Sequence, residues 1–91
     1  MMKVFKYPLE IKDEVSVPMP LGAKILTVQS QNNKPCIWAA VDPSTTYMEM
    51  RKFRIAGTGH PIADSTVDGY IGTVQLHGGM LVFHVFEVNP I

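Results

Sequence analysis

Alternation of apolar and polar side chains is the sequence feature that most constrains the fold. In the segment 3–11, Phe5 and Tyr7 share one face and Lys6 lies on the other, and similar short patterns recur along the chain. They occupy residues 15–19, 23–31, 36–42, 48–56, 70–77 and 80–88. Successive side chains of a strand point to opposite faces, so the pattern indicates strands, whereas no segment shows a capped helical stripe. The sequence predicts an all-β fold, a small barrel or sandwich of about seven mostly antiparallel strands.

Turn-forming residues divide these segments. Asn32-Asn33 predicts a hairpin between 23–31 and 36–42, because asparagine tolerates positive φ. Gly78-Gly79 predicts a second hairpin between 70–77 and 80–88. Pro18 and Pro20 place the segment 15–19 at a sheet edge. Gly72 lies inside an expected strand, where it marks a bulge or a close approach of another chain segment or a ligand.

Length and charge limit the classes of protein that remain. The chain has 91 residues, which suits a single domain over residues 1–91. Lys and Arg together number 8, as do Asp and Glu, which argues against nucleic acid or a membrane as the main partner. Cys36 is the single cysteine, so no intrachain disulfide forms. No secretory segment or apolar run of about 20 residues is present, and we expect a cytoplasmic protein.

The segment 80–88 is apolar on both faces. Met80, Val82 and Phe86 lie on one face, opposite Leu81, Phe83 and Val85. Such a strand is either central and covered on both sides, or closed on one side by another subunit. We expect a homo-oligomer, with the Met80, Val82 and Phe86 face buried against a second copy.

Polar side chains from several expected strands form a possible binding face if those strands are neighbours. They are Thr27, Gln29, Lys52, Arg54, Gln75 and His77. Two cations with amides and an imidazole suit an anionic small molecule better than a polymer. The alternative is an ordinary solvated face.

The segment 57–61 is a second candidate site. Thr58, Gly59 and His60 lie in a glycine-rich loop whose backbone N–H groups are able to form an anion-binding nest. It is neither a dinucleotide-binding fingerprint nor a phosphate-binding P-loop, because no helix follows and no Gly-Lys-Ser/Thr is present. The alternative is a tight turn that requires positive φ.

Trp38 is the only tryptophan and is a third candidate. Its neighbours on one face, Cys36 and Ala40, are small, so the indole is either a core residue or a platform on which a base stacks. The histidines His60, His77 and His84 are too scattered for a metal motif, and we expect no metal or cofactor. We expect His84 to be a hydrogen-bonded core or interface residue.

Three stretches carry a family resemblance. They are residues 3–9, residues 52–62 with the motif KFRIAGTGHPI, and residues 70–84 beginning YIGTVQLHGG. With them the chain resembles a family of small proteins of unknown function encoded by tailed phages and prophages. The resemblance implies no established activity and no catalytic residues. It implies two settings: an accessory virion or regulatory protein, and a counter-defence protein that sequesters a nucleotide immune signal of the host.

The residues favour binding over catalysis. We expect a non-enzymatic homo-oligomer that binds an anionic small molecule derived from a nucleotide. The alternative is a structural or protein-interaction module with no small ligand. An enzyme is third, because local sequence offers no nucleophile, base and orienting group together.

Overall fold

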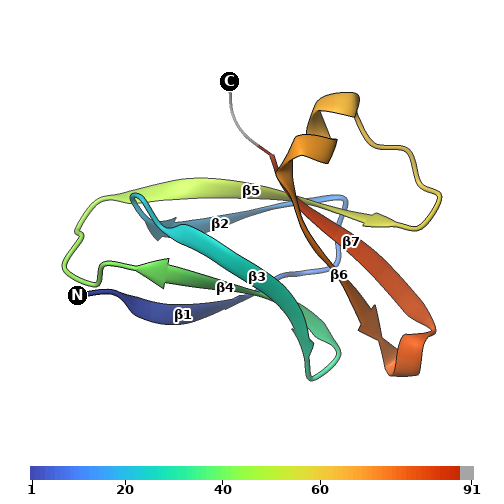
Figure 1. The fold of residues 1–91 in the computed structure, drawn as a ribbon, viewed down its shortest axis with the longest axis horizontal. Helices are drawn as coiled ribbons and strands as arrows, with labels where there is room; N and C mark the ends of the chain where they lie inside the picture. Colours follow the sequence, from blue (N-terminus) through green and yellow to red (C-terminus); the bar gives the residue numbers. More distant parts are fainter. Residues whose placement is uncertain (89–91) are drawn as a thin grey trace.

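The chain folds as an open sandwich of two antiparallel sheets (Figure 1). The computed structural model describes residues 1–88, and within them the chain forms seven strands and two short 3₁₀ segments. In order they are β1 (Lys3–Pro8), β2 (Glu14–Pro20), β3 (Lys24–Gln31), β4 (Lys34–Val41), β5 (Met48–Gly57), η1 (Asp64–Gly69), β6 (Tyr70–Leu76), η2 (His77–Gly79) and β7 (Leu81–Val88). Sheet A has the order β1-β4-β3 and sheet B the order β2-β5-β7-β6. The all-β prediction is confirmed, and of its two architectures the structure has the sandwich.

Both predicted hairpins are present, and their turns have the expected backbone. Asn32 and Asn33 have φ of 54° and 60°, which suits the two-residue turn between β3 and β4. Gly78 and Gly79 have φ of 67° and 94° between β6 and β7. The tips of the hairpins touch, because the His77 N–H donates to Asn33 Oδ1 over 3.1 Å.

The first expected strand is shorter than its alternating pattern. β1 ends at Pro8 rather than Ile11, and the Leu9 N–H donates to the Pro35 carbonyl. Leu9 is only 2% exposed, so it belongs to the core although it lies beyond the strand. β2 is an edge strand, as its prolines predicted.

The core fills the space between the two sheets. Ile37 from sheet A and Phe53 and Val85 from sheet B have no exposed surface. The buried cluster consists of Leu9, Met19, Ala23, Val28, Ile37, Ala39, Val41, Phe53, Ile55, Val74 and Val85. Alternate residues in parts of β4 and β5 contribute to it, namely Ile37, Ala39 and Val41, and Phe53 and Ile55.

The two sheets meet closely where β3 crosses β6. A Cβ added at Gly72 would lie 2.9 Å from Val28 Cγ1, so glycine permits this contact. The β6–β7 pairing also shifts register between Tyr70 and Gly72. The bulge and the close approach that Gly72 predicted are both present.

A bulge in β3 changes one expected face. The register shifts between Ile25 and Thr27, so Leu26 is 50% exposed while Val28 is buried in the core. Uninterrupted alternation over 23–31 would place Leu26 and Val28 on one face, and the extra residue of the bulge separates them.

β7 is central in sheet B and is covered on both faces by this chain. Phe86 is 7% exposed, and its ring centroid lies 5.6 Å from that of Tyr70. Met80 precedes the strand and is 86% exposed. The expected contact of Phe86 with a second copy is thus replaced by contacts within the chain.

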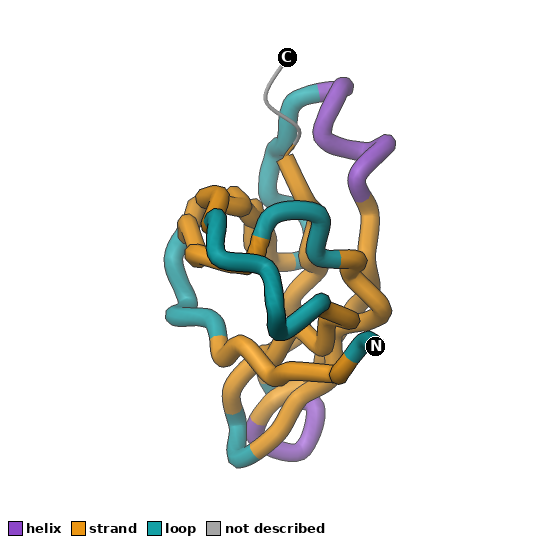
Figure 2. Tube along the Cα trace, turned by 90° about the vertical axis from the view of Figure 1, so that its left-hand side faces the viewer, coloured by secondary structure: helices purple, strands orange, loops and turns teal. Residues whose placement is uncertain are grey.

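The polar connection before β6 forms the 3₁₀ segment η1, which packs against β7. η1 and η2 lie at opposite ends of β6, at the top and bottom of Figure 2. Among the described residues, no helix is long and apolar enough to cross a membrane.

Candidate functional site

The polar face predicted from the sequence is divided between the two sheets. Thr27 and Gln29 lie on β3 of sheet A, whereas Lys52 and Arg54 lie on β5 of sheet B. Gln75 is on β6, and β7 separates it from β5. Lys52, Arg54 and Gln75 do share the outer face of sheet B, spread over three strands. Thr27 and Gln29 lie on the other sheet, because alternation assigns residues to faces but does not say which strands are neighbours.

Arg54 holds backbone together and is not free to bind an anion. Its Nη1 donates to the carbonyls of Asp13 and Ile55 over 3.2 and 2.6 Å, and its Nη2 donates to the Pro61 carbonyl over 3.1 Å. Its side chain is 17% exposed, in contrast to Lys52, which is exposed. Arg54 therefore ties the 57–61 turn to the start of β2.

The glycine-rich segment forms a tight turn. Gly59 has φ of 87°, and the His60 N–H donates to the Gly57 carbonyl over 3.1 Å. A Cβ on Gly57 would lie 3.2 Å from the His60 ring. The turn itself therefore explains both glycines, and at least one N–H of the expected nest is already used.

Thr58 belongs to a hydrogen-bonded chain on the outer face of sheet B. Thr58 Oγ1 lies 2.8 Å from His84 Nε2, and His84 Nδ1 lies 2.9 Å from Thr73 Oγ1. Thr73 in turn lies 2.7 Å from the Tyr70 hydroxyl. Both nitrogens of His84 are thus engaged, and the chain links the turn to β6 and β7. The expectation that His84 is hydrogen-bonded is confirmed.

Gln75 and His77 lie at the other end of β6. Gln75 is exposed opposite Val82, four residues along β7 from Phe86, the partner of Arg54. His77 has φ of 53° and its backbone N–H is bound to Asn33. At about 3.3 Å per residue, Gln75 lies more than 13 Å from Arg54 along the sheet. Trp38 lies on the other sheet, so one small ligand cannot contact Gln75, Arg54 and Trp38 together.

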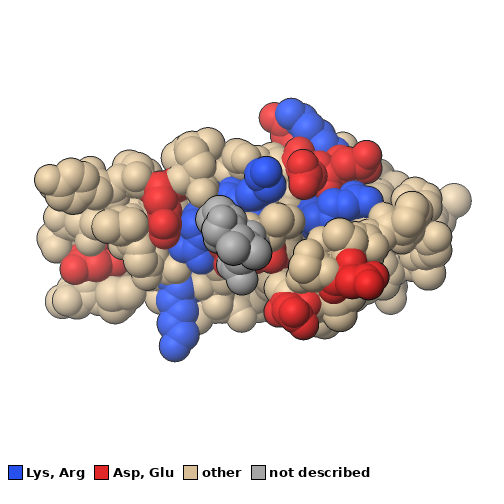
Figure 3. Space-filling view, turned by 90° about the horizontal axis from the view of Figure 1, so that it is seen from above, with Lys and Arg blue, Asp and Glu red and all other residues tan. Residues whose placement is uncertain are grey.

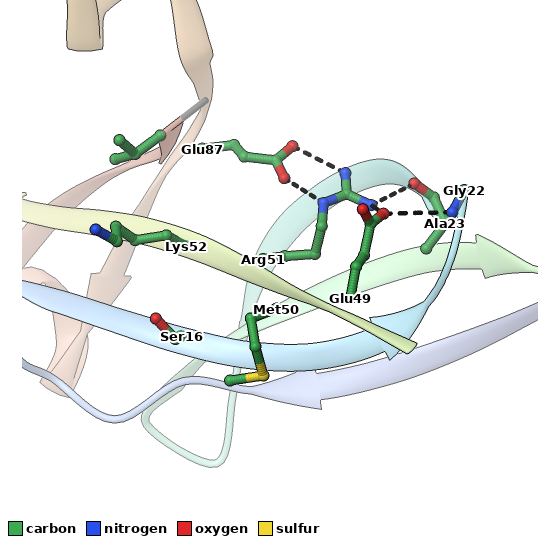
Figure 4. A pocket seen from close by; sticks show the side chains of 9 residues that line it. Ser16, Gly22, Ala23, Glu49, Met50, Arg51, Lys52 and Glu87 are labelled. Atoms are coloured by element: carbon green, nitrogen blue, oxygen red, sulfur yellow. Dashed lines mark hydrogen bonds and ion pairs between the residues drawn. The ribbon is translucent and has the colours of Figure 1, made fainter. Parts of the chain in front are cut away.

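A pocket of about 580 Å³ lies where β7 ends beside β5 (Figure 4). The lining residues are Ser16, Gly22, Ala23, Glu49, Met50, Arg51, Lys52, Glu87 and Val88. Within residues 1–88, β7 pairs with β5 from Lys52 onward, and the described partner of the stretch 48–51 is β2.

Arg51 is the central side chain of this pocket, and the sequence placed it on the core face without assigning it a role. Its guanidinium binds Glu87 through Nε and through Nη2, the latter over 3.1 Å, and it contacts Glu49 over 3.3 Å. Its Nη1 also donates to the Ala23 carbonyl over 2.7 Å, just before β3. The hydrogen bond to Glu87 raises the pKa of Arg51. Arg51 therefore connects the two sheets.

The charges of this pocket balance, so it does not favour an anion. Arg51 and Lys52 oppose Glu49 and Glu87, and the Arg51 donors are already taken. Seen from the side of β5 in Figure 3, cations and carboxylates are intermixed. Among the described residues, no three His, Cys, Asp or Glu side chains converge to hold a metal ion.

Trp38 lies on the outer face of sheet A and not in the core. Ile37 and Ala39 point inward with no exposed surface, and Trp38, between them, points outward and is half-buried. Its cross-strand neighbours are Lys6 on β1 and Thr27 on β3. Of the two interpretations of Trp38, the core residue is wrong and the outward-facing indole is observed.

The small neighbours of Trp38 differ in their exposure. Ala40 is half-buried beside the indole, between Val4 and Lys24. Cys36, on the other side, is 2% exposed. The Lys6 ammonium donates to Gln31 Oε1 across β4, and its stem passes over the Cys36 position.

The charges of the two sheets are strongly unequal. The strands of sheet A contain four lysines and no Asp or Glu: Lys3, Lys6, Lys24 and Lys34. The strands of sheet B contain three cations and three carboxylates: Arg51, Lys52, Arg54, Glu14, Glu49 and Glu87. Of the ion pairs found within residues 1–88, none includes a sheet A lysine. Three of these lysines, Lys6, Lys24 and Lys34, share the outer face with Trp38, so the balanced net charge of the chain is unevenly distributed between the sheets.

A family model described as a domain of unknown function, DUF7352, matches residues 1–90. The chain belongs to this family. No curated protein and no solved structure is detectably similar to it. For this member of DUF7352, the outer face of sheet A is the candidate site, because it combines an outward-facing, half-buried indole with cations that have no acidic partner in the same strands.

Proposed function

We propose that this protein binds an anionic small molecule with an aromatic ring, such as a nucleotide, on the outer face of sheet A. The supporting observation is the position of Trp38 among lysines with no carboxylate in the same strands. The indole stacks on a base, an interaction worth about 1–3 kcal/mol. Lys6 and Lys24 attract the phosphate.

A small molecule fits this face better than a nucleic-acid strand. Trp38 is the only tryptophan of the chain. The two aromatic residues of the neighbouring strand β1, Phe5 and Tyr7, belong to the inner face of sheet A. Single-strand binding proteins stack successive bases on several aromatic side chains. One platform accommodates one base.

The proposed action is binding without chemistry. The resemblance to phage proteins suggests a role in which a cytoplasmic homo-oligomer sequesters a host nucleotide signal. The alternative is an interaction module with no small ligand. The latter is favoured by Tyr47, Met48 and Met50, which are 75%, 58% and 62% exposed at one end of the sandwich.

Fluorescence titration tests the site directly, because the single tryptophan reports its own environment. We expect AMP and ATP to quench the emission, with adenosine binding more weakly because it lacks the phosphate. Inorganic phosphate alone competes only weakly. The nucleotide should be recovered unchanged by chromatography after prolonged incubation, and its conversion would contradict the non-enzymatic proposal.

Matched lysine substitutions locate the binding face. Lys24→Gln removes a cation of sheet A and should weaken nucleotide binding about fivefold, or about 1 kcal/mol. Lys52→Gln removes an exposed cation of sheet B and should leave the affinity unchanged. Absence of quenching at millimolar nucleotide, or equal losses in the two variants, would overturn the proposed site.

A further inference from the structure

We propose that β1 pairs antiparallel with β1 of a second copy, which joins two A sheets into one six-stranded sheet. The partner is a second copy of this chain, and the contact is made by backbone groups at the sheet edge. It replaces the Phe86 surface that the sequence suggested. The inference rests on the edge geometry of β1 and does not require ligand binding.

Among the strands within residues 1–88, the other sheet edges are covered or blocked. The edges β3 and β6 lie against each other, with Gly72 touching Val28. At the β2 edge, the Ile55 N–H donates to the Asp13 carbonyl, so odd-numbered residues of β2 bond to β5 and even-numbered ones face outward. Pro18 and Pro20 therefore stand at outward positions where they offer no N–H.

β1 keeps its outward donors. The Leu9 N–H bonds to the Pro35 carbonyl, so Phe5 and Tyr7 direct their backbone groups toward β4. Val4 and Lys6 then direct both N–H and C=O away from the sheet. Val4 is 58% exposed and Phe5 is 40% exposed, which shows that nothing in the described chain covers this edge.

The outward groups of β1 are self-complementary about a twofold axis at Phe5. In that register Val4 and Lys6 of one copy exchange backbone hydrogen bonds with Lys6 and Val4 of the second. Phe5 faces its equivalent in a non-hydrogen-bonded pair, where side chains approach most closely. Pro8 has no N–H and ends the ladder.

Neighbouring registers are less favourable. A shift by two residues in one direction sets Lys6 directly opposite its equivalent, where like charges repel. A shift in the other direction shortens the overlap of the two strands and separates the phenylalanines. The Phe5-centred register is therefore selected by charge and by apolar contact.

The pairing also affects the candidate site. It places the Trp38 platforms of both copies on the same face of one sheet, with Val4 of the second copy beside each Lys6. A contact along six residues buries less surface than the roughly 1,600 Å² of a standard interface. We therefore expect a dimer that forms in the micromolar range.

The first experiment compares two substitutions at Val4. Sedimentation of the unmodified protein should show a mass that rises with concentration from 10.1 kDa toward twice that value. Val4→Pro removes an N–H that points away from β4, so the fold persists while dimerisation weakens at least tenfold. Val4→Ala keeps the N–H and should dimerise nearly as well. Circular dichroism and thermal unfolding confirm that each variant is folded.

A cross-linking experiment tests the register. Phe5→Cys places a thiol opposite its equivalent across the axis, so mild oxidation should yield a covalent dimer rapidly. Lys3→Cys is the control, because position 3 faces position 7 of the second copy, about 13 Å from its own equivalent. Reaction of both variants at equal rates would contradict the register.

Two results would overturn the proposal entirely. One is a mass of 10.1 kDa at all concentrations up to about a millimolar, because the proposed strand pairing would then not form. The other is a Val4→Pro variant that is folded and dimerises like the unmodified chain. A titration of monomeric Val4→Pro with nucleotide separates the two proposals, because loss of dimerisation alone should leave its Trp38 quenching in place.

Discussion

Sheet A and sheet B use their charged residues in different ways. In sheet B, Arg51 and Arg54 are occupied by carboxylates and backbone carbonyls, and they connect strands, turns and sheets. In sheet A, Lys6 and Lys24 lie on the same face as the half-buried Trp38, and the strands contain no acidic residue. The difference indicates that the two arginines of sheet B stabilise the fold, whereas the lysines of sheet A have no acidic partner that a ligand would have to displace.

The largest expected effect is on Arg51, the side chain that joins the sheets. Arg51→Met removes every partner of Glu87 within the pocket and leaves a carboxylate that is only 20% exposed beside the core. Loss of one member of a largely buried ion pair should lower the free energy of unfolding by about 2–4 kcal/mol. Urea denaturation measures this change.

Two controls accompany that measurement. Lys52→Met removes the adjacent, exposed cation and should change stability by less than about 0.5 kcal/mol. Adding Glu87→Gln to Arg51→Met should restore part of the loss, because the unpaired charge is gone. An Arg51→Met protein as stable as the Lys52→Met protein would refute the structural role of Arg51.

The next effect concerns the contact between the sheets at Gly72. Gly72→Ala places a methyl group 2.9 Å from Val28 Cγ1, and overpacking of this kind costs about 1–3 kcal/mol. Thermal unfolding should show the loss. The double variant with Val28→Ala removes the overlapping methyl groups, so its two changes should combine to less than the sum of their separate costs. Strictly additive costs would show that the two residues do not touch.

The smallest effect concerns the hydrogen-bonded chain on sheet B. Thr58→Val removes the hydroxyl bound to His84 Nε2 and should lower the free energy of unfolding by about 0.5–1.5 kcal/mol. Thr46→Val, in the exposed β4–β5 loop, is the matched control and should change it little. Neither change should alter nucleotide binding at Trp38, since both lie outside sheet A. A loss of affinity in Thr58→Val would move the candidate site to sheet B.

Local sequence predicted strands and turns well because these depend on neighbouring residues. The asparagine pair, the glycine pair and the prolines of β2 each act through their own backbone preferences, and each has the expected place. Pairing between distant strands has no comparable local signal. Thr27 and Lys52 therefore seemed to share a surface although they lie on different sheets, and Phe86 seemed to need a second copy although Tyr70 covers it.

The candidate site was predictable only in part, for a similar reason. The small neighbours of Trp38 indicated either a core residue or an open platform, and the indole faces outward but is half-buried. The sequence did not predict that lysines lie beside Trp38. Lys6 is its neighbour only because β1 pairs with β4, and this pairing between distant segments has no local sequence signal. Arg51 could have been found from the alternation alone, since a charged residue on the core side of a strand needs a buried partner.

The order of strands in sheet A has a consequence for the kinetics of folding. The β3–β4 hairpin closes over two residues, whereas β1 must return across the chain so that Lys3 meets Val41. Because long loops close more slowly than short turns, β1 should dock late, after both hairpins have formed. Substitutions in β1 should then accelerate unfolding more than they slow folding. Because β1 docks last, only chains that have already folded expose this edge strand to a second copy. This order limits association between incompletely folded molecules.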